Sequence, residues 1–290
     1  MKINLRQLTI ASLFFLLLNS CSIQKIALNT TSGLFEYGIE ALYAEPDLQI
    51  AETAITANLK LIEGFHRADP KNKTILDMLT QGYSGLALAF LEDSAPDRAS
   101  RIYLRARDYG LLRLQQTKAF KNGIPVKESD FVARLPMLEK KDLPTLFWTA
   151  FAWAGWVNLN RNDPQAVFDL SKVKAMMTRV LELDETFFFG SAHLFWGSTL
   201  GSIPPMLGGS PEKAKEHFEK ALAISDGKFL ITKVYYAQFY ATTTLDEELF
   251  DRMLSEVLEA PEDVLPGYEL LTAVAKRKAA DLQSRKDDIL

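Results

Sequence analysis

Histidine is the side chain most often used for acid–base catalysis and metal binding near neutral pH. The sequence contains three histidines, His66, His193 and His217, and none has another histidine four residues away, so the zinc-binding helix of metalloproteases is absent. His66 and His217 stand among charged residues typical of a solvated helix face, whereas the aromatic surroundings of His193 predict a buried, hydrogen-bonded ring. With only one cysteine besides, the sequence predicts neither a metal site nor a cofactor.

Two glycine-containing motifs could carry other chemistry. Residues 82–85 (Gly-Tyr-Ser-Gly) are similar to a nucleophile elbow, but they lack the second glycine of Gly-x-Ser-x-Gly. No strand is expected before them either. Residues 207–213 could cradle an anion at a helix start, but they are better explained as a turn followed by an N-cap at Ser210 and a first helical residue at Pro211. Neither motif supports catalysis, and we expect that the protein is not an enzyme.

Cys21, the only cysteine among 290 residues, ends a pattern typical of a secretion signal. Lys2 and Arg6 precede a nearly continuous apolar stretch over residues 8–18, which is shorter than the roughly 20 residues that cross a bilayer. Residues 18–21 (Leu-Asn-Ser-Cys) resemble the lipobox of bacterial lipoprotein precursors, in which the cysteine is acylated and becomes the first mature residue. An ordinary signal peptide with an incidental cysteine is the alternative.

The lipobox predicts how the chain is divided and where it resides. Residues 1–20 are expected to be a lipoprotein signal peptide, 21–33 a lipidated tether and 34–290 a helical repeat domain. Acyl chains on the cysteine would hold the protein on a membrane, and the serine that follows favours the outer membrane, facing the periplasm. The formal net charge of −4 argues against a nucleic-acid partner.

Aromatic clustering is the strongest indication of a binding site. Residues 146–156 are apolar all round the expected helix, which predicts burial on every side, yet tryptophan is seldom buried completely. A cavity or subunit interface for a small apolar ligand would explain this concentration. The residues expected to line it are Trp148, Trp153, Trp156, Trp196 and Tyr236. Asn158 and Gln238 could add polar groups.

Apolar residues recur at intervals of three and four, so the chain is expected to be helical throughout. Most of the twelve prolines fall where helices should begin or end, because a proline inside a helix costs about 3 kcal/mol. The main interruption is 120–143, with a short helix near 129–135. The predicted helices are 34–43, 47–67, 72–92, 96–119, 144–161, 171–183, 186–202, 211–224, 229–242, 246–259 and 266–284.

A small–large–small pattern repeats along these helices. Residues 214–221 read Ala-x3-Phe-x2-Ala, residues 99–106 read Ala-x3-Tyr-x2-Ala, and residues 173–180 are a looser copy. The last motif residues at 180 and 221 are 41 positions apart, longer than the usual period of about 34 in tetratricopeptide repeats. We therefore expect an all-α fold of irregular tetratricopeptide-like hairpin repeats, stacked as an α-solenoid or bundle. The basic residues 276–278 would suit a polar cap at its end.

Several stretches carry a family likeness. They are 147–153 (Phe-Trp-Thr-Ala-Phe-Ala-Trp) with 173–177, then 207–218 (Leu-Gly-Gly-Ser-Pro-Glu-Lys-Ala-Lys-Glu-His-Phe), 234–237 and 105–110. Together they resemble the T component of TRAP transporters that use a tetratricopeptide-repeat protein. The resemblance implies a periplasm-facing lipoprotein that forms a homotrimer. It also implies a periplasmic solute-binding protein as partner and the passage of a small, possibly hydrophobic ligand. It brings no catalytic residue.

Two functions from different classes follow. The first is a lipid-anchored accessory component of a TRAP-type transporter, in which the aromatic helix borders a ligand cavity. The alternative is an outer-membrane repeat lipoprotein that acts as a protein-binding scaffold in envelope assembly. A scaffold would have a solid core near residues 148–156, so an internal cavity there distinguishes the two.

Overall fold

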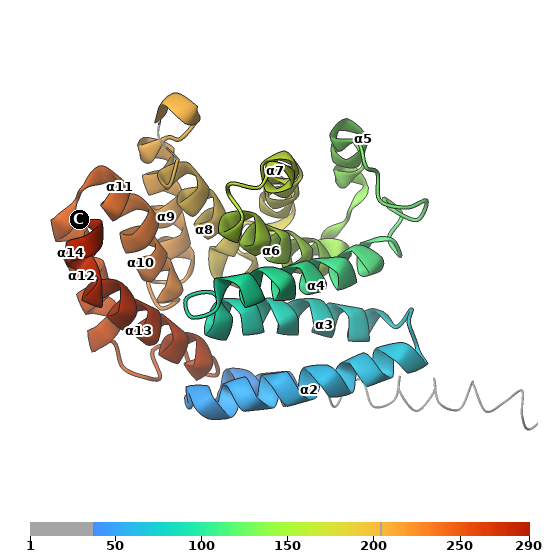
Figure 1. The fold of residues 1–290 in the computed structure, drawn as a ribbon, viewed down its shortest axis with the longest axis horizontal. Helices are drawn as coiled ribbons and strands as arrows, with labels where there is room; N and C mark the ends of the chain where they lie inside the picture. Colours follow the sequence, from blue (N-terminus) through green and yellow to red (C-terminus); the bar gives the residue numbers. More distant parts are fainter. Residues whose placement is uncertain (1–36, 204) are drawn as a thin grey trace, which may run out of the picture.

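The computed structural model describes residues 37–203 and 205–290. Every regular element in these two ranges is a helix, which confirms the predicted all-α class. Cys21, the signal peptide predicted for 1–20 and the tether predicted for 21–33 lie outside the described residues. The helices stack side by side and form a curved array (Figure 1).

Residues 37–43 are helical and precede the labelled elements. The α-helices that follow are α2 (Leu48–Ala68), α3 (Lys73–Leu86), α4 (Pro96–Leu114), α5 (Glu128–Val132), α6 (Leu143–Leu159), α7 (Pro164–Asp184), α8 (Phe187–Gly201), α9 (Pro211–Ile224), α10 (Ile231–Tyr236), α11 (Thr242–Thr244), α12 (Glu247–Glu259), α13 (Glu269–Ser284) and α14 (Lys286–Ile289). Two π-helical turns, η1 (Ala87–Leu91) and η5 (Ala237–Ala241), continue α3 and α10. The 3-10 turns are η2 (Leu135–Met137), η3 (Lys140–Asp142) and η4 (Pro205–Leu207).

Polar caps and prolines begin the helices, as the sequence predicts. The carboxylate of Asp47 accepts hydrogen bonds from the backbone N–H groups of Gln49 and Ile50 at the start of α2. Ser210 caps α9 in the same way through the N–H of Lys213. These contacts satisfy N–H groups that have no partner within the helix. The prolines at first helical positions include Pro96, Pro164 and Pro211.

Two predicted boundaries were wrong. The helix expected over 171–183 begins at Pro164, because Asp163 caps it and the proline suits a first turn. Its first turns expose Val167 and Phe168, so the apolar periodicity there does not report the buried face. The helix expected over 96–119 ends at Leu114, whose carbonyl accepts a hydrogen bond from the Thr117 hydroxyl.

The repeated small–large–small motif packs helices closely, as expected. Ala99, Ala106, Ala214 and Ala221 are fully buried. The large residue of each motif lies on a glycine of a neighbouring helix: Tyr103 covers Gly155, and Phe218 covers Gly197. A Cβ at Gly197 would lie 2.9 Å from the Phe218 ring, so these helix pairs are closer than alanine would permit.

The array closes on itself. Helix α13 packs against α2 as well as α10 and α12, and Figure 1 shows one end of α13 close to one end of α2. The Lys278 ammonium lies 2.6 Å from Asp93 Oδ2 and 3.4 Å from Glu92 Oε1, in the turn after η1. Lys278 is buried, so the expectation that residues 276–278 form a solvated cap is wrong for this residue. Helix α13, the last long helix, therefore completes a wall that begins with the first hairpin, which is formed by α2 and α3.

Among the described helices, none combines the length and the apolar character needed to cross a bilayer.

Candidate ligand cavity

A cavity of about 330 Å³ lies inside this closed array. Its wall is built from both ends of the chain: residues 37–43, α2, α3 with η1, α6, α8, the region from Phe229 through α10, and α13. Each of these helices contributes part of one side, so no single hairpin could form the cavity. The contact between α13 and the first hairpin, α2 with α3, brings the two ends of the chain together around this partly open cavity.

Among the described residues that line the cavity, none has a charged side chain. Its polar groups come from Asn58, Gln81, Ser191, Tyr43 and Tyr235. The Gln81 amide donates a 2.7 Å hydrogen bond to the Tyr43 hydroxyl, and the Ser191 hydroxyl donates to the carbonyl of Phe188. Most of the remaining wall is aliphatic or aromatic, which suits an apolar molecule.

The two tyrosines of the wall stay neutral near physiological pH. Burial raises the pKa of Tyr43 to about 12, against a smaller lowering effect of the hydrogen bond from Gln81. Burial also raises the pKa of Tyr235 well above its usual value, and the neighbouring carboxylates of Glu92 and Asp93 add to this shift. The cavity therefore offers hydroxyl donors and no ionised group.

One side of the cavity is a set of packed aromatic rings. The ring centroids of Trp148 and Phe188 are 4.8 Å apart, and those of Trp148 and Phe151 are 5.5 Å apart, both in edge-on arrangements. Phe188 also contacts Phe229, at 6.0 Å. Edge-on pairs at these distances add about 0.5–1.5 kcal/mol beyond burial of their surface. This side is therefore well packed rather than loosely filled.

The backbone at Phe188 is unusual. Phe188, Phe189 and Gly190 have φ/ψ values of 44/59°, 59/29° and 74/25°, so three consecutive residues at the start of α8 are left-handed. For a non-glycine residue this conformation costs about 1–2 kcal/mol. Because the Phe188 side chain lines the cavity, backbone strain occurs directly at its wall.

A second backbone irregularity at the cavity wall is the π-helical turn that follows α3. The π-helical turn η1 contributes Leu88 and Ala89 to the wall. The carbonyl of Ala89 accepts a hydrogen bond from the Arg277 guanidinium of α13. A π-helical turn leaves such carbonyls free of their usual partner, and these turns are frequent at functional sites. The irregular turn thus contributes both to the cavity and to the closure of the array.

A sequence model of the TRAP transporter T-component family matches residues 44–290, which span all the labelled helices. The chain belongs to the TRAP transporter T-component family. This confirms the resemblance found in the sequence, and it makes the protein an accessory component of a transporter rather than a member of an enzyme class. Among curated proteins, no significant match is found.

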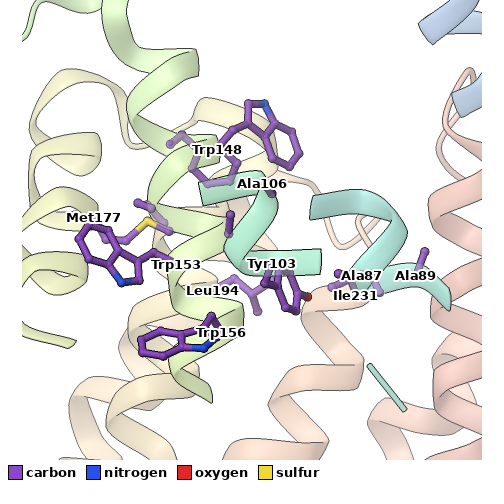
Figure 2. Close-up of a cluster of buried hydrophobic side chains, with 14 of the residues drawn as sticks. Ala87, Ala89, Tyr103, Ala106, Trp148, Trp153, Trp156, Met177, Leu194 and Ile231 are labelled. Atoms are coloured by element: carbon purple, nitrogen blue, oxygen red, sulfur yellow. The ribbon is translucent and has the colours of Figure 1, made fainter. Parts of the chain in front are cut away.

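Of the five residues predicted to line the cavity, one is part of its wall in this T component. Trp148 belongs to the wall, whereas Trp153 and Trp156 leave α6 in other directions (Figure 2). The Trp153 indole donates a 3.0 Å hydrogen bond to Asp169, and the Arg107 guanidinium lies over both of these rings at 5.4 and 5.8 Å. These two tryptophans therefore join α6 to α4 and α7.

The other two predicted residues also pack elsewhere. Trp196 lies parallel to the His217 ring with centroids 6.2 Å apart, and Tyr236 stacks on Phe218 at 4.7 Å. The neighbouring Tyr235, rather than Tyr236, lines the cavity. Asn158 and Gln238, the expected polar groups, are not part of the wall either.

Sequence reasoning missed most of the wall on α3. Met78, Gln81, Gly82, Gly85 and Leu88 stand at i, i+3, i+4, i+7 and i+10, so they form one stripe along this helix and η1. Gly85 has open space beside it, whereas the Leu59 side chain of α2 lies 2.8 Å from where a Cβ at Gly82 would be. The stripe is present in the sequence, but it equally predicts close helix packing.

His193 and His217 form a pair that the sequence did not predict. His193 is buried and hydrogen-bonded as expected, but His217 is not simply solvated: its Nδ1 lies 2.8 Å from Nδ1 of His193. Nε2 of His193 lies 3.2 Å from a Glu185 carboxylate oxygen. Burial, followed by the effect of His193, lowers the pKa of His217 to about 4. Within 37–203 and 205–290, no group of three or more potential ligands could hold a metal ion.

Proposed function

We propose that this T component is a lipid-anchored periplasmic protein that holds a small, uncharged, mainly apolar molecule. It exchanges this ligand with the periplasmic solute-binding protein of its transporter. The observation that carries the proposal is the partly open cavity of about 330 Å³, to whose wall the described residues contribute no charged side chain. A scaffold needs no such space, so the cavity beside Trp148 favours transport over the scaffold alternative.

The size and chemistry of the cavity limit the ligand. Binding sites for small molecules commonly measure about 300–1,000 Å³, so this cavity suits a compact molecule. Burying about 250 Å² of apolar ligand surface would contribute about 6 kcal/mol before the costs of association. A carboxylate would lose its hydration without gaining a cationic partner, so organic anions are disfavoured. The phenol of Tyr43 can orient one acceptor group of the ligand.

The location and assembly are further parts of the proposal. The lipobox at residues 18–21 supports acylation of Cys21, and the following serine supports an outer-membrane location facing the periplasm. Membership of the T-component family supports association with a TRAP transporter. We propose a homotrimer that binds the solute-binding protein directly. Trp196, which is only partly buried, remains a candidate for a contact in the assembled complex, whereas Trp153, Trp156 and Tyr236 are buried within the subunit.

Native mass spectrometry of residues 22–290, alone and mixed with the solute-binding protein of the same transporter, tests this function. We expect a discrete trimer, uptake of the partner, and a small neutral passenger that is released on activation. A monomer that takes up neither partner nor passenger would contradict the transport function. Such a result would leave a repeat scaffold as the better description.

A further inference from the structure

The left-handed turn at residues 188–190 needs a physical explanation. Phenylalanine is unfavourable in this conformation because its Cβ approaches the following carbonyl oxygen, and here two phenylalanines adopt it in succession. Strained backbone persists only where the surrounding contacts determine it, and such strain is concentrated at ligand clamps and switching segments. This turn lies at the wall of the only cavity described above, so its location connects the strain with ligand binding.

Aromatic packing is what keeps the turn in place. The ring of Phe188 packs between Trp148 and Phe229, while the ring of Phe189 stacks on Phe229 at 5.0 Å and meets Tyr268 edge-on at 5.1 Å. Phe188 faces the cavity, whereas Phe189 packs on residues that precede α10 and α13 and does not line it. The strain and the packing oppose each other, since moving Phe188 loses ring contacts but allows the backbone to relax.

We propose that Phe188 is a displaceable plug that sets the upper size of ligand the cavity accepts. An uncharged apolar molecule larger than the resting cavity displaces the Phe188 ring from Trp148. Relaxation of residues 188–190 towards right-handed backbone offsets part of the lost packing. The cavity thus enlarges at this wall, whereas the regular helices α3 and α6 keep their positions. This inference rests on the proposed ligand-binding function and adds a size-determining residue to it.

Two uncharged fluorescent probes test the plug: N-phenyl-1-naphthylamine as the smaller and Nile red as the larger. In Phe188→Ala the larger probe should bind about fivefold to tenfold more tightly, because it no longer displaces a ring from its aromatic partners. Binding of the smaller probe should change far less. Phe188→Leu, which keeps an apolar side chain of intermediate size, should give an intermediate preference even if the alanine variant folds poorly.

Phe189→Ala is the matched control. It removes the same ring from the same strained turn, but Phe189 does not line the cavity, so the ratio of the two affinities should stay at the wild-type value. If the Phe188 and Phe189 variants change this ratio equally, the plug is refuted while the ligand cavity stands. If neither probe binds the wild-type protein, the proposed ligand-binding function is refuted instead.

Gly190→Ala tests the turn without using a ligand. An added Cβ would lie 2.9 Å from Cδ1 of Ile224, and alanine is unfavourable at a φ of 74°, so the substitution should shift the turn away from its left-handed form. Hydrogen–deuterium exchange at the amides of residues 188–191 should become faster than in the wild type. Unchanged slow exchange in Gly190→Ala would overturn the inference whatever the probes show.

Discussion

Lys278 links α13 to the turn after η1, and the loss of stability on removing its charge can be predicted from the structure. The Lys278 side chain is 4% exposed, and its partners Glu92 and Asp93 are 16% and 37% exposed. Lys278→Met keeps the aliphatic stem but removes the charge. Glu92 would remain partly buried, with hydrogen bonds from the hydroxyls of Tyr103 and Tyr235 as its remaining compensation. Removing one partner of a fully buried ion pair costs about 3–5 kcal/mol, and the exposure of Asp93 reduces this to about 2–4 kcal/mol.

The expected structural consequence is release of α13 from the first hairpin. Leu270, Leu271 and Val274 of this helix line the cavity, so its release also opens the wall. Denaturant unfolding of residues 22–290 measures the loss of stability. Hydrogen–deuterium exchange measures the opening of α13, and binding of N-phenyl-1-naphthylamine measures the state of the cavity. All three should change together in the Lys278→Met variant.

Lys286→Met is the matched control. Lys286 also forms an ion pair with a carboxylate, that of Asp251 at 2.8 Å, but it lies nearer the surface and contributes nothing to the cavity. Exposed pairs contribute little, so this variant should behave almost as the wild type. The double substitution Lys278→Met with Glu92→Gln should recover part of the lost stability, because no unpaired buried charge remains. Equal effects of the two lysine variants on α13 exchange would refute the closure argument.

Three further predictions concern packing, protonation and anchoring. Gly155→Ala should destabilise the protein by about 1–3 kcal/mol, because its methyl group would overlap the Tyr103 ring; Gly64→Ala, with open space around it, should be neutral or stabilising in the same denaturant assay. Since burial lowers the pKa of His217 from 6.5 to about 4, the unfolded chain binds more protons, and stability should fall as the pH falls from about 6.5 towards 4. His217→Gln should flatten that dependence in thermal unfolding, and an unchanged slope would contradict the assigned shift. Cys21→Ser should abolish incorporation of labelled fatty acid and release the protein from the membrane fraction, and continued labelling would place the lipid elsewhere.

Most helices could be predicted because their signals are local. Caps, prolines and apolar periodicity lie within a few residues of the boundaries they determine, as Ser210 and Pro211 show at the start of α9. The errors at α7 and α4 arise where local and tertiary signals differ. Val167 and Phe168 are apolar but exposed, so hydrophobicity alone misplaced the start of α7.

The candidate site could be predicted only in part. The uniformly apolar α6 identified Trp148 as a wall residue, but one helix cannot indicate which of its sides borders a space and which meets α4 or α7. Trp153 and Trp148 look alike in the sequence, yet Trp153 finds a buried partner in Asp169. The neighbours that distinguish Trp148 from Trp153 lie on other hairpins. The residue type alone therefore did not indicate which of these tryptophans lines the cavity.

The sequence by itself determined the all-α class, the hairpin repeats and the T-component family, because these depend on periodicity, spacing and motif identity within short stretches. Only the tertiary structure decided that the array closes, because Lys278 and Glu92 meet across most of the chain. It also decided the left-handed backbone at Phe188, where contacts with Trp148 and Phe229 outweigh local preference. The cavity depends on both of these long-range effects, because its wall combines residues from both ends of the chain that no local pattern relates to one another.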